Sequence, residues 1–133
     1  MVEHWDKPSN ITLLGGIPHQ EVLRHLDESD LFLFPSHTEG SSIALIECMA
    51  RGVPAVATSV GSNADMLKGG CGILVEKEDT DAMLAAIQTL RDPLKREAMS
   101  RCAVQRATEQ YSDKNIDCIV NVLKKLVETK KGI

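Results

Sequence analysis

The sequence predicts an α/β fold, a Rossmann-like parallel sheet with flanking helices. Short apolar segments alternate along the chain with segments of helical periodicity, which is typical of βαβ units. The apolar segment at 31–34 is continuous, as expected for a strand that is buried on both faces. A polar turn follows it directly, and open α/β sheets bind their ligands at such carboxyl ends of strands.

Four strands are expected, and they come early in the chain, at 11–14, 31–35, 53–58 and 72–76. A helix is expected at 19–26, a second from about 42 to Gly52, and a short third, capped by Asn63, that ends before Gly69. Three further helices are indicated by Met83, Leu84, Ile87 and Leu90, by the pair Asp92 and Pro93, and by Ser112 followed by Ile116, Val120, Leu123 and Val127. A complete Rossmann-type domain usually has six strands, so the strand count is low.

Size and composition are those of one soluble globular domain. The chain has 133 residues, of which 43% are hydrophobic and 26% charged. Aromatic residues make up only 3%, and the formal net charge is −4, so nucleic acid is not expected as a partner. No apolar segment approaches membrane-spanning length and no signal-peptide pattern opens the chain, so a cytoplasmic location is expected. Peripheral membrane contact of a longer parent protein stays open.

The four cysteines are widely spaced and include no CxxC pair. Such spacing favours neither a zinc site nor a disulfide framework, and no bound metal is expected. Reduced thiols in a cytosolic compartment are the simplest interpretation. The cysteines are Cys48, Cys71, Cys102 and Cys118.

The polar turn from Pro35 onward carries the candidate site. Ser41 or Ser42 is expected to cap the helix that follows, and the free N–H groups at 40–43 suit a phosphate. Glu39 lies in the turn and Glu47 on the helix. An ionised carboxylate only accepts hydrogen bonds, so both suit the vicinal hydroxyls of a sugar or ribose. Two glutamates eight residues apart also arise by chance in an acidic domain, so their spacing alone decides nothing.

The segment 35–61 as a whole resembles the signature of the retaining GT-B glycosyltransferases that use nucleotide sugars. The residues that match, with the family's spacing, are Pro35, Ser36, Glu39, Gly40, Glu47, Met49, Ala50, Gly52, Pro54, Val56, Ala57, Thr58 and Gly61. Weaker resemblance extends to 11–15, to 72–75 and to Tyr111 with Ser112. The two glutamates correspond to the family's E-x7-E motif.

The resemblance implies a role for each residue of the turn. Glu39 is the expected catalytic-site glutamate that contacts the hydroxyls of the donor sugar. The four residues after it approach the sugar and its diphosphate through their amides; they are Gly40, Ser41, Ser42 and Ile43. Glu47 is expected to bind the ribose hydroxyls. The implied reaction is glycosyl transfer from a nucleotide sugar with retention of configuration, without a metal or a cofactor beyond the donor itself.

Some features of the family are altered or missing. Ser62 stands where many members have glycine, 63–65 replace Ile-Pro-Glu, and Asp113 replaces a common tryptophan. The acceptor-binding N-terminal domain and an Arg/Lys pair for the diphosphate are absent from the sequence. We therefore interpret 1–133 as a single partial nucleotide-sugar-binding domain, the C-terminal part of a GT-B enzyme. The fragment alone is expected to be inactive, with the acceptor bound by the missing domain.

Two further expectations follow. In the family's strand order, the missing strands would lie between the strands at 11–14 and 31–35, so both are left with open edges that invite self-association, within one molecule or with a second copy. Two alternative functions also remain, a sugar-nucleotide epimerase with a similar fold, and a non-catalytic fragment that binds a nucleotide or a partner protein. The E-x7-E spacing and the pattern Met49, Ala50 and Gly52 favour the transferase.

Overall fold

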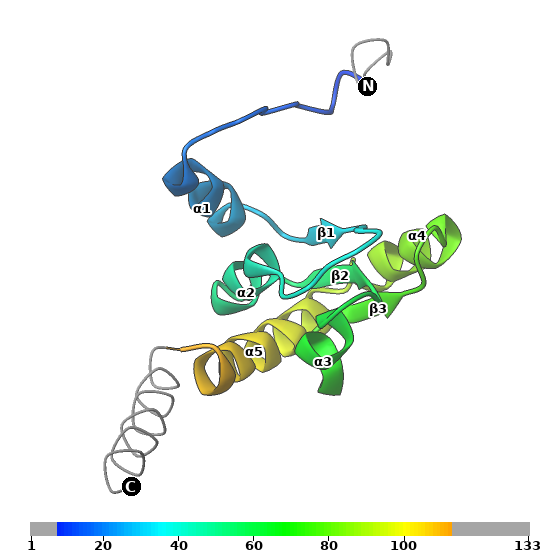
Figure 1. The fold of residues 1–133 in the computed structure, drawn as a ribbon. Helices are drawn as coiled ribbons and strands as arrows, with labels where there is room; N and C mark the ends of the chain where they lie inside the picture. Colours follow the sequence, from blue (N-terminus) through cyan, green and yellow to red (C-terminus); the bar gives the residue numbers. More distant parts are fainter. Residues whose placement is uncertain (1–7, 113–133) are drawn as a thin grey trace, which may run out of the picture.

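The computed structural model describes residues 8–112, which form an α/β fold around a small parallel sheet (Figure 1). The strands are β1 (Phe32–Phe34), β2 (Ala55–Thr58) and β3 (Ile73–Val75), in the order β1-β2-β3. Both pairings are parallel. All four residues of the central strand are buried. The segment at 31–34, which was expected to be buried on both faces, forms the edge strand β1 instead, and none of the three residues of that strand is fully buried. The fold class and three of the four expected strands are therefore confirmed.

Five α-helices and one 3-10 turn connect and flank these strands. They are α1 (His19–Asp27), α2 (Ile43–Ala50), α3 (Asn63–Leu67), the 3-10 turn η1 (Lys68–Gly70), α4 (Thr80–Thr89) and α5 (Pro93–Gln110). The expected helices of this part of the chain are all present. The last expected helix, from Ser112 onward, falls almost entirely outside the described residues.

The larger part of the core lies on the face of the sheet that carries α2 and α5. Alternation along β2 points Ala55 and Ala57 to this face. Three fully buried side chains of α2 meet them, at the spacing of one helical face; they are Leu45, Cys48 and Met49. Small residues at Ala103 and Ala107 let α5 approach α2 closely.

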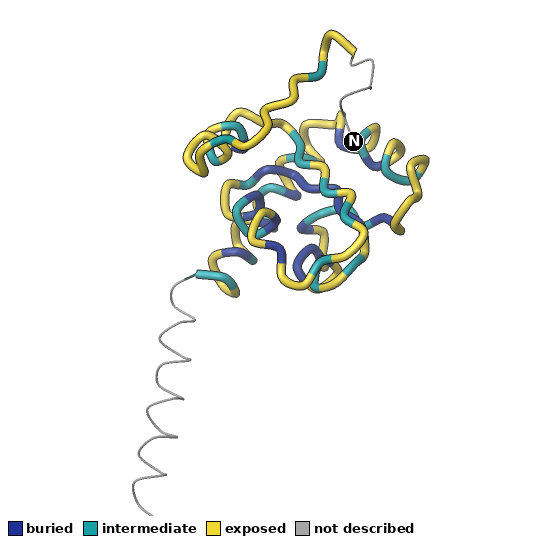
Figure 2. The backbone as a smooth tube through the Cα atoms, turned by 45° about the horizontal axis from the view of Figure 1, so that its top comes forward, coloured by how far each residue is buried: buried dark blue, intermediate teal, exposed yellow. Residues whose placement is uncertain are grey.

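The opposite face is covered less completely. Val56 points to it and packs with Val75, and α4 contributes Ala86 to the same cluster. Leu33 of β1 nevertheless remains 41% exposed. β1 pairs only with β2, so its other edge has no partner strand in the described part of the chain. Figure 2 shows how buried and exposed segments alternate around this small core.

The prediction of a strand at 11–14 is wrong. These residues form irregular chain, and Leu13 is 57% exposed. Figure 1 shows this segment extending away from the sheet. A strand is stable only when a neighbour satisfies its backbone, and no described strand lies beside it. Among residues 8–112 the two expected edges therefore do not pair with each other, while pairing with a second copy stays a prediction.

The expectation of reduced thiols is wrong for two of the four cysteines. Cys71 and Cys102 form a disulfide, with their Cα atoms 4.9 Å apart. The bond joins the segment before β3 to α5, across 31 residues of sequence. Sequence spacing missed it because the fold, and not a local motif, brings these two side chains together. Cys48, on the buried face of α2, is a free thiol, and Cys118 lies outside the described residues.

From residue 8 to residue 112, no helix combines the length and the apolar character that crossing a bilayer requires.

Candidate functional site

The predicted turn lies at the carboxyl end of β1 and leads directly into α2. Ser42 is the N-cap of α2, and its buried Oγ accepts a hydrogen bond of 3.2 Å from the backbone N–H of Leu45. Of the two serines considered, Ser42 is therefore the cap. The backbone N–H of Ile46 already donates to the carbonyl of Ser42. The N–H groups of Ile43 and Ala44 are left without a partner among residues 8–112, as is usual at a helix start.

The side chain of Glu39 is held by a hydrogen bond from another residue of the same turn. The Oγ of Ser36 donates to Oε1 of Glu39 at 2.9 Å, and the carboxylate is half-buried. Ser36 is itself fixed by β2, because Oγ1 of the buried Thr58 donates to its carbonyl at 2.6 Å. A chain of hydrogen bonds therefore runs from the end of the central strand to the candidate carboxylate.

The loop after β2 supports the same turn through its backbone. The N–H and the Oγ of Ser62 both donate to the carbonyl of Gly40, at 3.2 and 2.8 Å. Gly61 has a φ of +53°, and a Cβ on it would lie 1.9 Å from the carbonyl oxygen of Glu39. Only glycine permits this close approach. The glycine and serine that follow β2 thus shape the turn that carries Glu39.

Asn63 has a role different from the expected helix cap. It is the first residue of α3, and the N-cap, Ser62, makes no side-chain capping bond. The fully buried Nδ2 of Asn63 donates to the carbonyl of Thr58 at 3.0 Å. Its Oδ1 is buried without a hydrogen-bond partner among the described residues. Asn63 therefore ties the end of β2 to the loop that supports the turn.

Glu47 lies one turn along α2, on the same face as the exposed Ile43. Its Oε1 is 2.6 Å from Nε2 of His19, the first residue of α1. Because an ionised carboxylate only accepts, Nε2 carries the proton and donates. Packing beside α1 leaves 23% of the Glu47 side chain exposed.

All six predicted site residues therefore lie on the turn after β1 and on α2. Sequence reasoning missed three residues that support them. Ser36 could have been recognised, since a serine three residues before a turn carboxylate is a local signal. Thr58 and His19 act over 22 and 28 residues of sequence, and no local pattern indicates such contacts.

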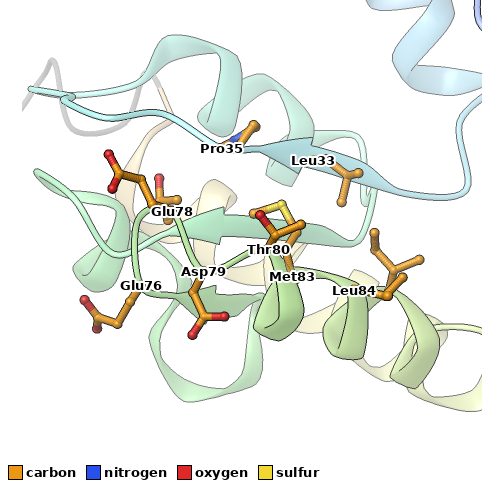
Figure 3. A pocket seen from close by; sticks show the side chains of 10 residues that line it. Leu33, Pro35, Glu76, Glu78, Asp79, Thr80, Met83 and Leu84 are labelled. Carbon is orange, nitrogen blue, oxygen red and sulfur yellow. The ribbon is translucent and has the colours of Figure 1, made fainter.

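A cavity of about 420 Å³ lies on the α4 side of the sheet, beside the free edge of β1 (Figure 3). It is at the carboxyl ends of the strands, where Pro35 follows β1 and Thr58 ends β2. Its wall is aliphatic and its rim acidic; the other lining residues are Leu33, Glu76, Glu78, Asp79, Thr80, Met83, Leu84 and Ile87. Glu39 and Glu47 do not line it, but Thr58, whose hydroxyl supports the turn of Glu39 through Ser36, does.

In the described part of the chain, no three His, Cys, Asp or Glu side chains gather closely enough to hold a metal ion. The expectation that the chain binds its ligand without a metal remains a prediction.

The likeness of this chain to known proteins is consistent across sequence and structure. A mannosyltransferase from Corynebacterium glutamicum, described as GDP-mannose-dependent and acting on a monoacylated phosphatidylinositol monomannoside, is 29% identical over 115 residues. These residues are 80% of this chain and 30% of that protein. The chain thus spans about a third of the length of such relatives.

Solved structures share the fold. Sucrose-phosphate synthase from Thermosynechococcus elongatus superposes with a TM-score of 0.80 at 25% identity, over 90% of this chain and 30% of that one. The C-terminal domain of a glycosyl transferase group 1 family protein (LpcC) from Francisella tularensis has a TM-score of 0.68 at 22% identity. It matches over 74% of this chain and 52% of its own. The family described as glycosyl transferases group 1 matches residues 2–92, and the chain therefore belongs to this family.

Proposed function

We propose that this chain is the donor-binding part of a retaining glycosyltransferase, and that it holds a nucleotide sugar. The observation that carries the proposal is the geometry of the Glu39 turn. A carboxylate fixed at the carboxyl end of a parallel strand stands immediately before the open N-terminus of α2. Glu47 follows one turn along the same helix. Acceptor groups for hydroxyls and donor groups for phosphate are thus adjacent.

Each part of the ligand has a chemical counterpart. The free N–H groups at the start of α2 and the positive end of the helix dipole favour the diphosphate. The carboxylates of Glu39 and Glu47 repel that diphosphate, so they must face hydroxyl groups. Glu39 takes those of the sugar, and Glu47 those of the ribose. Glu39, next to the sugar, is then the residue whose loss affects transfer most.

The name of one relative supports a nucleotide-sugar donor. The mannosyltransferase from Corynebacterium glutamicum is described as dependent on GDP-mannose. Because this chain spans about a third of the length of such relatives, the activity of the parent protein is part of the proposal. We infer that acceptor binding and turnover need the remainder of the parent enzyme, and that this fragment binds the donor without transferring its sugar. The proposal that the anomeric configuration is retained rests on the resemblance of 35–61 to retaining enzymes. Proton NMR of the first product of the parent enzyme tests it, because it reports the configuration at the anomeric carbon.

Calorimetric titration of the 133-residue chain with UDP, GDP and ADP tests donor binding directly. One of the three is expected to bind, and Glu47→Ala to weaken it by roughly 1.5–3 kcal/mol, the scale of hydrogen bonds to a charged group. Glu76→Ala is the matched control. It removes the exposed carboxylate of a residue that follows β3, whereas Glu47 lies on α2. If a folded chain, checked by circular dichroism, binds none of the three, the proposal is wrong and a non-catalytic interaction role is favoured.

A further inference from the structure

The contact between His19 and Glu47 joins two segments that sequence reasoning did not connect. Nε2 of His19 lies 2.6 Å from Oε1 of Glu47, and no other hydrogen bond to this carboxylate occurs among residues 8–112. One oxygen of the carboxylate is therefore occupied by an N–H donor, and Oε2 is left for a ligand.

The two partners differ in exposure in a way that suits a positioning role. The His19 side chain is 65% exposed, while that of Glu47 is 23% exposed. A free glutamate on a helix surface samples many rotamers, and a ligand that needs one of them must order the side chain. The histidine does this before the ligand arrives, which lowers the ordering cost of binding.

His19 is the first residue of α1, a helix that packs against the rest of the fold. At the other end of α1, Asp27 forms an ion pair with Arg51, the C-cap of α2. Between the two polar contacts, the buried Leu26 packs into the core. The position of His19 is therefore set by the docking of a whole helix, and does not depend on the bond to Glu47 alone. A site residue held by rigid elements keeps its geometry better than one on a loop.

The geometry points to His19 as a positioning residue for Glu47, which orients that carboxylate toward the vicinal diol of a ribose. This inference rests on the proposed function and deepens it, because it assigns to α1 a part in recognising the nucleoside. His19 itself does not touch the ligand. Its effect passes through Glu47, so it must depend both on that glutamate and on the ribose hydroxyls.

The test compares ligands with and without the diol. The chain is titrated with whichever of UDP, GDP and ADP binds most tightly, and with the 2′,3′-dideoxy form of the same nucleotide. His19→Ala is expected to raise the Kd of the ribonucleotide about 3- to 10-fold, the effect of one ordinary hydrogen bond. It should leave the Kd of the dideoxynucleotide unchanged. His19→Gln, which keeps an N–H donor, should restore most of the affinity.

Two controls separate positioning from a loss of structure. Glu28→Ala removes an exposed ion pair with Arg24 that stays on the surface of α1 and does not reach α2, and it should leave nucleotide affinity unchanged. In a Glu47→Ala background, His19→Ala should have no further effect. An equal loss for both nucleotides, or additive losses in the double variant, overturns the inference while donor binding stands. A wild-type chain that binds no nucleotide overturns the proposed function, and this inference with it.

Discussion

Gly61 lies directly against Glu39, so closely that a Cβ on the glycine would be 1.9 Å from the carbonyl oxygen of the glutamate. The loop after β2 and the turn after β1 are therefore a single backbone unit. Two hydrogen bonds from Ser62 to the carbonyl of Gly40 continue the same contact. The carboxylate at the candidate site depends in this way on a residue that carries no side chain.

Gly61→Ala is expected to displace the turn and to weaken nucleotide-sugar binding. The positive φ alone costs about 1–3 kcal/mol of unfolding free energy for a residue with a Cβ, and the clash with Glu39 adds to it. Gly69→Ala is the matched control, since Gly69 has a φ of +75° and open space around its Cβ position. Urea denaturation of both variants measures the difference. If Gly61→Ala and Gly69→Ala lose the same amount of stability, the close contact between Gly61 and Glu39 adds nothing to the cost of the substitution.

Glu39 and its turn could be predicted from sequence because every signal for them is local. An apolar segment, a proline, a polar turn and a capping serine follow one another within twelve residues of 31–42. The strand at 11–14 had an apolar signal of the same kind, but strands form only beside a partner. Sequence alone does not say whether the partner is present.

The disulfide and the contact between His19 and Glu47 could not be predicted for a related reason. Each joins residues that lie about thirty positions apart. They become neighbours only after α5 has packed beside η1, or α1 beside α2, and no spacing rule encodes that packing. The hydrogen bond from Ser36 to Glu39 is different. The two residues are only three positions apart, so this contact could have been predicted from the sequence.

Ser36→Ala is expected to weaken the binding of a nucleotide sugar more than that of the corresponding nucleoside diphosphate. The variant removes the hydroxyl that donates to Oε1 of Glu39, and Glu39 is proposed to face the sugar. The expected loss is about 0.5–1.5 kcal/mol for the nucleotide sugar, measured by calorimetry. Ser59→Ala, which removes an exposed hydroxyl after β2, should change neither affinity. Equal losses for both ligands from Ser36→Ala would contradict a role directed at the sugar.

Reduction of the Cys71–Cys102 disulfide is expected to lower the free energy of unfolding by roughly 2–4 kcal/mol. The bond joins the segment before β3 to α5 across a sequence separation of 31 residues, and it removes conformational freedom from the unfolded chain. Urea denaturation with and without dithiothreitol measures the change. Cys102→Ser should be as unstable as the reduced chain and insensitive to the reductant. A wild-type chain that is equally stable in both buffers would contradict the prediction.

The thiol of Cys48 is expected to be inert in the folded chain. It is fully buried on α2 and lies 3.2 Å from the carbonyl oxygen of Val53, to which it donates. Burial raises the pKa of Cys48 to about 12, because the thiolate would lose its hydration. Only the thiolate reacts with disulfide reagents, so labelling at pH 8 must wait for the chain to open.

The same shift sets a pH dependence of stability. The folded-state pKa of Cys48 lies above its ordinary value of 9.0, so burial of the neutral thiol stabilises the fold fully below about pH 9. This contribution is lost as the pH rises from there toward 12.

Labelling of a Cys118→Ser variant with a thiol-reactive disulfide at pH 8 measures the reactivity of Cys48. Its rate should match the unfolding rate and rise with urea, and rapid labelling without urea would show that α2 does not shield this residue.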